Sequence, residues 1–395
     1  MTVLSSRSAV PHGPRISTLA TKILRLVSSG VVTTRTELAD ELAAPPSTIS
    51  SAVGQLVELG LVVEHGQQSS TGGRPRKVLR LGRKDDFAIA ADIGAHHARI
   101  GVVLPGGRLE HVENVKFSID EGPETGLDRL STAFARLAEA QGAENWRAVG
   151  LSMPGPVDTG SGTVELPSRM PGWNRFPIVS WLQDKLARPV VVDNDANCMA
   201  FAEQLVQPNT HRRTVLVKAG SAIGAGIVID GELYRGANGV AGDITHVRVD
   251  AAGDTPCSCG NTGCLETIAS GLALVRIVSE QGVPVTSVQD VVQLAIEANP
   301  IATRAVRRAG AYLGEVLAAN VNFFNPDGVY LGGYLATLEA FVAAVRSQLY
   351  DDCHPLVTRH LSISRAKLGE NGGITGAGVS ALQAAVVDSL EALSS

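Results

Sequence analysis

Two strand–turn–strand patterns with glycines inside them divide most of the chain into two halves. The first covers residues 87–104 and contains Asp92-Ile93-Gly94, and the second covers residues 214–229 and contains three glycines. Each opens a stretch in which short apolar strands alternate with helical patterns, which is typical of an α/β unit. The repetition predicts two α/β lobes with a cleft between them and a boundary in the polar stretch 207–213.

The chain of 395 residues is longer than one hydrophobic core usually supports, so we expect two or three domains. No stretch approaches the roughly 18 consecutive apolar residues that a membrane span needs. The first 15 residues lack the charged and then apolar pattern of an export signal. We therefore expect a cytoplasmic protein that has no membrane partner.

The N-terminal residues predict three helices in front of the α/β body. Apolar side chains recur at helical spacing over 16–27. Thr34 and Glu37 have the spacing of a capping box, which predicts a short second helix. A third helix is expected after Pro45-Pro46, with Ser47 as its N-cap and Gly60 as its end.

Two short apolar stretches, 61–64 and 78–81, flank a polar loop that contains three glycines. This pattern predicts a two-stranded ribbon with a long tip. Three helices followed by such a ribbon make a winged helix-turn-helix.

The charge of this N-terminal unit points to a polyanionic partner. Residues 1–84 hold 11 Lys and Arg against 5 Asp and Glu, although the whole chain has a net charge of −5. The start of the third helix would reach the major groove of DNA, and the Gly-Arg-Pro run in the tip can place a guanidinium in the minor groove. The expected DNA contacts are Ser47, Thr48, Ser50, Ser51, Arg74, Arg76 and Lys77. The alternative is a protein-interaction or dimerisation module whose basic residues are incidental.

One histidine and three cysteines lie within nineteen residues, in a stretch with several glycines. Three sulfurs and one nitrogen suit tetrahedral zinc, and no position is left for water, so we expect a structural zinc ion. The ligands would be His246, Cys257, Cys259 and Cys264. The alternatives are buried cysteines without a metal, or a redox pair. The other two cysteines, Cys198 and Cys353, are expected to pack as small apolar side chains.

Four segments give the chain a resemblance to a known family. They are Gly150 to Asp158, the Asp-Asn-Asp-Ala-Asn run 193–197, Gly239 to His246, and the cluster from Cys257 to Glu266. Together they resemble the ROK family of repressors, open reading frames and kinases that act on sugars. The resemblance covers essentially the whole chain, and a winged helix-turn-helix in front matches the repressor branch.

The resemblance implies an α/β fold with a two-lobed, actin-like (ribonuclease H-like) sugar-kinase body behind a winged helix-turn-helix domain. The domains would be 1–84, 85–207 and 208–374, with the zinc loop in the third and a C-terminal helix, 375–395, completing the first lobe. A sugar would lie between the lobes.

The same resemblance implies a set of sugar-contacting residues: Asn194, Asp195, Asp243, His246 and Glu266. Carboxylate, amide and imidazole groups are what sugar hydroxyls need in a partly buried site. In kinase members the aspartate at the Asp195 position acts as the general base on the hydroxyl that attacks ATP. The alternative for these acidic residues is an ordinary solvated loop.

The phosphate-binding parts depart from the kinase pattern. Kinases of the family carry Asp-x-Gly-Gly-Thr in the first hairpin, whereas here Gly94 is followed by Ala95-His96-His97. The second loop usually reads Gly-Thr-Gly-Ile-Gly and here reads Gly-Ser-Ala-Ile-Gly. Since phosphate cradles use glycine to let backbone N–H groups approach, we expect ATP and magnesium to bind weakly or not at all. The remnants of the site are Asp92, Gly94, Gly220 and Gly224. Asp243 and Thr245 also stand where the family has glutamate and glycine.

These observations predict a sugar-responsive transcriptional regulator, most simply a repressor, without significant kinase activity. It would bind operator DNA as a homodimer or homotetramer and sense a sugar or sugar phosphate in the cleft. The sequence leaves activation open as well as repression. One alternative is an ATP-dependent sugar kinase that also binds DNA. This alternative is favoured by the retention of Asp92, Asn194 and Asp195. Another is a constitutive DNA-binding protein whose body serves only for oligomerisation.

Overall fold

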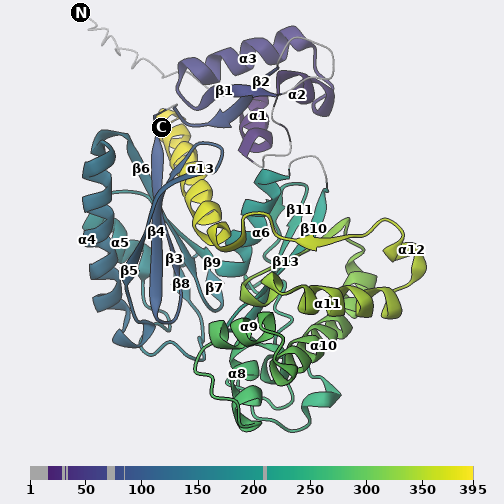
Figure 1. Cartoon of the computed structure of the whole chain (residues 1–395). Coiled ribbons are helices and arrows are strands. Elements are labelled where there is room, and N and C mark those ends of the chain that lie inside the picture. The colour runs from purple at the N-terminus through teal and green to yellow at the C-terminus, as the bar shows by residue number, and fades with distance from the viewer. Residues whose placement is uncertain are drawn as a thin grey trace, which may run out of the picture.

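A computed structural model describes residues 17–28, 32, 34–68, 76–83, 85–207 and 211–394. Figure 1 shows a small N-terminal head that sits on a body of two lobes. The predicted two-lobed α/β fold with an N-terminal helical unit is confirmed, and each lobe contains a five-stranded mixed sheet. Within the described ranges, no helix is long and apolar enough to cross a bilayer.

The head contains three helices and a two-stranded antiparallel ribbon. Its elements are α1 (Thr18–Ser28), α2 (Arg35–Glu41), α3 (Pro46–Glu58), β1 (Val62–Gln68) and β2 (Arg76–Leu81). The predicted capping box is present, because the Thr34 hydroxyl accepts from the Glu37 backbone N–H and the Glu37 carboxylate accepts from the Thr34 N–H. The ribbon tip, 69–75, lies outside the described residues.

The start of α3 differs from the prediction. The helix begins at Pro46, with Pro45 as a cap that makes no side-chain hydrogen bond, so Ser47 is not the N-cap. The reason is that proline has no N–H to lose in the first turn and its fixed φ already suits a helix. The shift places Ser47 inside the first turn of α3.

The sheet of the first lobe has the strand order β5-β4-β3-β6-β9. Its strands are β3 (Phe87–Ile93), β4 (His97–Leu104), β5 (Arg108–Lys116), β6 (Trp146–Met153) and β9 (Val190–Asn194). The β3–β4 hairpin is the first predicted glycine-bearing pattern, and β6 and β9 are added parallel to β3. Helices α4 (Pro123–Gln141) and α5 (Ile178–Leu186) pack with this sheet, and a small ribbon, β7 (Val157–Asp158) with β8 (Thr163–Val164), follows β6.

The sheet of the second lobe repeats this plan in the order β12-β11-β10-β13-β14. Its strands are β10 (Arg213–Ala219), β11 (Ile223–Ile229), β12 (Glu232–Leu233), β13 (Gly328–Gly332) and β14 (Ser362–Arg365). Here too an antiparallel hairpin, β10–β11, is followed by parallel strands, so the predicted duplication is present. The helices are α7 (Glu266–Ala269), α8 (Gly271–Glu280), α9 (Val288–Ile296), α10 (Pro300–Phe324), α11 (Glu339–Asp352) and α12 (Pro355–Thr358).

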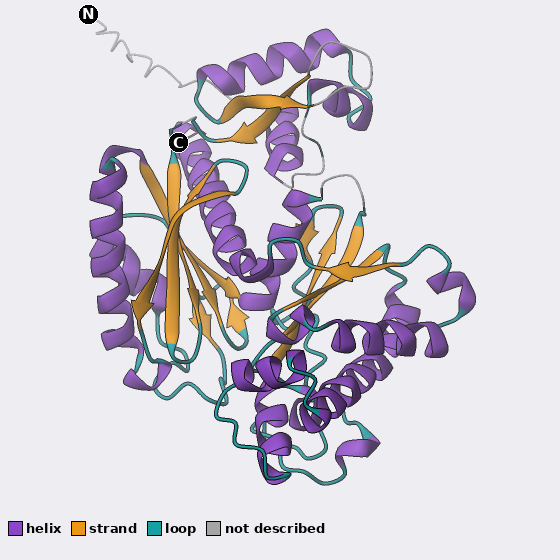
Figure 2. Ribbon diagram, viewed as in Figure 1, coloured by secondary structure: helices purple, strands orange, loops and turns teal. Residues whose placement is uncertain are grey.

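Two helices, α6 (Asp195–Val206) and α13 (Gly372–Ser394), lie between the two sheets, as Figure 2 shows. Helix α13 packs against β3, β6 and α6, so this C-terminal helix covers the inner face of the first sheet. The two helices approach closely because α13 has Gly376 at the crossing, where a Cβ would clash with the carbonyl oxygen of Cys198.

The head contacts both lobes. Val386 near the end of α13 is buried and belongs to the same apolar cluster as Leu24 and Leu81 of the head. On the other side, Arg212 just before β10 lies 3.7 Å from the Glu41 carboxylate of α2. The head therefore touches both lobes, through a buried apolar contact on one side and an exposed ion pair on the other.

Candidate functional site

The three clustered cysteines and His246 converge at one point in the second lobe. Their ligand atoms all lie within 4.8 Å of one another. The His246 Nδ1 is 3.6 Å from the Cys257 Sγ, and the Cys259 and Cys264 sulfurs are 3.8 Å apart. With Zn–S bonds of about 2.3 Å, neighbouring sulfurs of a tetrahedral site should be about 3.8 Å apart. The cluster could therefore bind a metal such as zinc.

The loop that carries these ligands is shaped by its own backbone. The Cys257 N–H donates to the Asn261 carbonyl, and Gly263 takes a positive φ of 73° where a Cβ would meet the Gly253 carbonyl oxygen at 2.5 Å. Burial is the main cause that raises the pKa of the Cys264 thiol to about 12, and the Asn261 backbone N–H is the main cause that lowers the pKa of Cys259. A bound cation would supply the charge that holds all three sulfurs as thiolates.

Glu266 follows the cysteine loop at the start of α7, and its carboxylate is fully engaged within the protein. It is 4% exposed. One oxygen accepts from the Thr245 hydroxyl at 2.7 Å and from the Ile223 N–H at 3.2 Å, and the other accepts from the Arg169 guanidinium at 2.8 Å. A sugar that contacts Glu266 would have to compete with these donors.

Asn194 and Asp195 lie at the junction of β9 and α6. The Asn194 side chain caps α6 by accepting from the N–H groups of Ala196 and Asn197, and its amide donates to the Gly155 carbonyl at 2.9 Å. The predicted sugar contact is thus also the N-cap of the helix. An Asn directly after a buried strand is a sequence signal for such a cap.

The remaining predicted sugar contacts, Asp243 and His246, lie in the loop between β12 and α7. The Asp243 side chain is exposed, whereas the His246 imidazole is half-buried and belongs to the cysteine cluster. These two residues and Glu266 come from one lobe, while Asn194 and Asp195 lie where the first sheet ends and α6 begins.

Three basic residues that sequence reasoning missed form ion pairs with acidic residues of the predicted sugar site and its surroundings. Arg235 pairs with the buried Asp193 at 2.6 Å, Arg169 pairs with Glu266, and Lys218 pairs with Asp195. Each pair joins residues far apart in sequence, so spacing gave no sign of them. For Lys218 a signal existed, because a lysine interrupts an otherwise apolar strand just before the glycine loop.

The first remnant of the phosphate site is shaped by side chains of its own hairpin. The Asp92 carboxylate accepts from the Ser152 hydroxyl at 2.6 Å. The His97 imidazole lies over Gly94, where a Cβ would be 3.1 Å from the ring. An imidazole thus covers the backbone that would have to approach a phosphate.

The second remnant is a tight turn between β10 and β11. The Gly220 N–H donates to the Ala222 carbonyl, and the Ile223 N–H donates to Glu266. Two N–H groups of this loop are therefore already engaged within the protein. A Cβ added at Gly224 would lie 3.3 Å from the Cβ of Ala196 in α6, so this residue of the turn packs closely against the helix.

The predicted DNA-facing residues at the start of α3 share one exposed surface. Ser47, Thr48, Ser50 and Ser51 are all exposed, whereas Ile49 between them is buried in the head. Arg74 lies outside the described residues, and the structure describes Arg76 only as the first residue of β2.

Lys77 at the base of the ribbon is exposed, but its ammonium pairs with Glu64 of β1. Arg35 of α2 pairs with the same carboxylate at 3.0 Å and also donates to the Ser50 carbonyl of α3. This network ties the ribbon to the second and third helices. Pairing with Lys77 is the main cause that lowers the pKa of Glu64.

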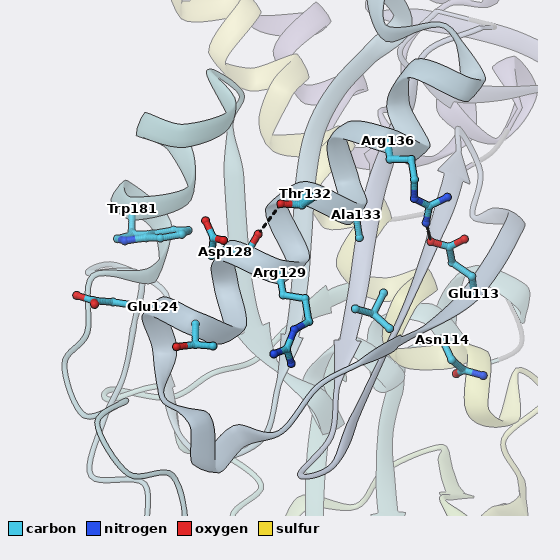
Figure 3. Close-up of a pocket in the computed structure, with 11 residues that line it drawn as sticks. Glu113, Asn114, Glu124, Asp128, Arg129, Thr132, Ala133, Arg136 and Trp181 are labelled. Atoms are coloured by element: carbon cyan, nitrogen blue, oxygen red, sulfur yellow. Dashed lines mark hydrogen bonds and ion pairs between the residues drawn. The ribbon is translucent and has the colours of Figure 1, made fainter.

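A hollow of about 890 Å³ lies elsewhere, on the outside of the first lobe between β5, α4 and α5. Figure 3 shows Arg136 directed at Glu113 and Trp181 at the other end of the hollow. None of the predicted site residues lines it. Most of its charged groups are already paired, as Arg129 is with Glu121 at 2.7 Å, so we assign no ligand to it.

Comparison with known proteins places this geometry in a family. Residues 88–384 match the model of the ROK family. Over 350 residues the chain is 29% identical to the xylose repressor of Bacillus spizizenii, which covers 87% of this chain and 89% of that protein.

Two solved structures share the fold. A ROK family transcriptional regulator described as a homolog of the E. coli MLC protein superposes with a TM-score of 0.74 and 23% identity, covering 94% of this chain and 98% of that chain. A ROK family glucokinase from Streptomyces griseus, in complex with glucose and AMPPNP, gives a TM-score of 0.67 and 27% identity, covering 75% of this chain and 99% of that chain. The regulators thus match a larger share of this chain than the kinase does. Because the family model spans well over half of the sequence, the chain belongs to the ROK family.

Proposed function

We propose that this chain is a sugar-responsive transcriptional regulator that binds operator DNA through its head and a sugar in the cleft between its lobes. The observation that carries the proposal is the attachment of the head to both lobes, through Val386 on one side and Arg212 on the other. The similarity to a xylose repressor over most of the chain supports the same function.

DNA would be bound through α3 and the ribbon. The exposed hydroxyls of Ser47, Thr48, Ser50 and Ser51 suit base edges and phosphates, and Lys77 suits phosphate. Arg74 and Arg76 are proposed as contacts from the sequence alone. A homodimer or homotetramer would present two heads to the half-sites of an operator.

The sugar would be bound near Asn194, Asp195, Asp243, His246 and Glu266. Hydroxyl groups need several polar partners, and this region supplies carboxylates, an amide and an imidazole. Support comes from the glucokinase of similar fold, which was crystallised with glucose. A zinc ion on His246 and the three cysteines would fix the loop that carries His246 and leads into Glu266.

A sugar alters DNA binding only if it prefers one arrangement of the lobes. About a hundredfold weakening of operator binding requires about 2.7 kcal/mol of difference in sugar affinity between the two arrangements. A few hydrogen bonds made in one arrangement only can supply this difference. In this proposal, three units change position relative to one another. They are residues 1–84, residues 85–207 together with helix 375–395, and residues 208–374.

The test is a titration of DNA from the protein's own upstream region, with and without a panel of sugars and sugar phosphates. Tight, salt-dependent DNA binding that one sugar weakens or strengthens is the expected result. DNA binding that no sugar changes would favour a constitutive DNA-binding protein, and failure to bind any upstream DNA would reject the proposal.

The second candidate is a sugar kinase that also binds DNA. It is favoured by the position of Asp195 at the start of α6 and by the likeness to the glucokinase. A coupled assay with ATP, magnesium and sugars tests it, and we expect no robust turnover, because the glycine turns and Asp195 are engaged with other groups of the protein.

A further inference from the structure

Lys218 is the one charged residue in the sequence from 214 to 229. It lies near the end of β10, one residue before Ala219, which is the last residue of the strand. Its neighbours in the strand are apolar, and an isolated lysine in a buried strand is costly unless its ammonium finds a partner. The ammonium of Lys218 therefore needs a specific partner of opposite charge.

The partner is Asp195, with which the Lys218 Nζ forms an ion pair. The two side chains are 26% and 15% exposed, so the pair is only partly accessible to water. Burial alone would lower the pKa of Lys218, but the carboxylates of Asp195 and Asp92 outweigh it and raise the pKa above its usual value. Lys218 therefore stays protonated and positively charged at neutral pH.

The charges around Lys218 come from three elements that meet between the lobes, in the region where β3, α6 and β10 approach one another in Figure 1. Asp92 lies in β3, Asp195 begins α6, and Lys218 lies in β10. Cys198 of α6 lies near the same carboxylates. Burial is the main cause that raises the pKa of its thiol, followed by the charges of Asp193, Asp92 and Asp195.

The neighbouring carboxylates have other partners. Asp193 has Arg235, and Glu266 has Arg169. Asp92 accepts a hydrogen bond from Ser152, and its charge, after that of Asp195, helps to raise the pKa of Lys218.

A divalent cation binds proteins through free carboxylate oxygens, and magnesium in particular brings nucleotide phosphates to one or two carboxylates. A resident ammonium beside such carboxylates opposes a second cation by repulsion and by occupying an oxygen. The residues present here therefore do not fit a metal-bound nucleotide.

We propose that Lys218 is the built-in counter-ion of the cleft: its ammonium takes the place of a divalent cation beside Asp195 and Asp92, so that the cleft receives a sugar alone, without a metal-bound nucleotide. The part of this inference that concerns the sugar rests on the proposed function. The covered backbone at Gly94 and the engaged N–H of Gly220 act in the same direction, but Lys218 is the residue that sets the charge.

The test measures Mn²⁺ binding by electron paramagnetic resonance, with and without ATP, in the full-length protein. Wild type is compared with Lys218→Met, which keeps the length of the side chain and removes its charge. We expect Lys218→Met to bind Mn²⁺ at least about tenfold more tightly than wild type, because one like charge next to the carboxylates is removed. Adding Asp195→Asn to Lys218→Met should abolish the gain.

Two further variants keep the result interpretable. Lys185→Met is the matched control, because Lys185 also pairs with an aspartate, Asp128, but on the outer surface of the first lobe. Lys218→Arg retains the charge and should bind Mn²⁺ as weakly as wild type. If Lys218→Met fails to fold, Lys218→Gln replaces it.

Equal Mn²⁺ binding by wild type and Lys218→Met would overturn the proposal, as would a gain no larger than that of Lys185→Met. The sugar titration of operator DNA is run on the same proteins. If no sugar changes DNA binding while Lys218→Met gains Mn²⁺, the proposed function fails and the role of Lys218 as a counter-ion stands.

Discussion

The guanidinium of Arg169 meets the carboxylate of Glu266 at 2.8 Å and joins the two lobes. Arg169 lies in the loop between β8 and α5 of the first lobe, whereas Glu266 begins α7 of the second. The carboxylate is buried and the guanidinium is half-exposed, and the same Arg169 nitrogen lies 3.4 Å from the Ser258 hydroxyl of the cysteine loop. A ligand of Glu266 would therefore have to break or share this ion pair.

Replacing Arg169 by alanine should destabilise the protein, because the buried Glu266 carboxylate loses a charged donor. A hydrogen bond to a charged group contributes about 1.5–3 kcal/mol, so we expect a clear drop in Tm in a thermal melt. Arg175→Ala is the control, since Arg175 pairs with Glu165 on the exposed surface of the same loop and should change stability by less than about 1 kcal/mol. Equal drops in Tm for the two variants would show that the Arg169–Glu266 pair stabilises the protein no more than an exposed surface pair does.

Removal of the cysteine cluster's metal should lower the Tm of the second lobe. We expect about one zinc per chain by elemental analysis, and its loss on treatment with a strong chelator. Cys257→Ser should lose the metal, because three ligands bind zinc less well than four. Cys353→Ser is the matched control, since Cys353 is buried outside the cluster and should leave the zinc content unchanged. A wild-type protein that contains no metal when purified without chelators would contradict the assignment.

Val386→Ala should loosen the head from α13. Val386 is 8% exposed and packs in the apolar cluster of the head, and loss of its methyl groups should cost on the order of 1 kcal/mol. We expect the variant to bind sugar normally but to lose part of the sugar's effect on operator affinity.

Val387→Ala provides the control, because the neighbouring Val387 is 51% exposed and should change neither property. If Val386→Ala kept the full sugar response, coupling between the cleft and the head would have to pass through another contact, such as Arg212 with Glu41.

Lys77→Ala should weaken operator binding about equally for all sequences, because a lysine–phosphate contact carries no base information. Each phosphate contact contributes about 0.9 to the slope of log K against log salt on duplex DNA, so the slope should fall by about that amount. Lys116→Ala on the body should leave the slope as it is. An unchanged slope for Lys77→Ala would remove this residue from the interface.

The head should lose stability at acid pH in part through Glu64. Pairing with Lys77 first, and then with Arg35, lowers the pKa of this carboxyl from its ordinary value of 4.5. The stabilisation is therefore present at neutral pH and is lost as the pH falls below that value and through the lowered pKa. Glu64→Gln should reduce the dependence of the head's Tm on pH between neutral and strongly acid solution. The same dependence in wild type and Glu64→Gln would exclude Glu64 as its cause.

Local features of the fold were predictable because short-range interactions decide them. The Thr34–Glu37 capping box and the two glycine-bearing hairpins all formed where the sequence indicated. The predicted start of α3 was wrong, because the two prolines together suggested a break in the chain. Pro46 is in fact compatible with the first turn of a helix.

The charge pairs of the cleft were not predictable, since each depends on how distant elements pack. Arg169 and Glu266 are separated by 97 positions, and Arg235 and Asp193 by 42. The family resemblance named Glu266 and Asp195 without their partners. Only packing shows that an arginine and a lysine already occupy these carboxylates.

The order of synthesis has a consequence for the head. Val386 completes an apolar cluster whose other members, such as Leu24 and Leu81, emerge from the ribosome much earlier. A nascent or truncated chain that lacks the end of α13 would expose this part of the cluster to water and to chaperones. The apolar core of the head is therefore complete only after the chain has been translated through both lobes as far as Val386.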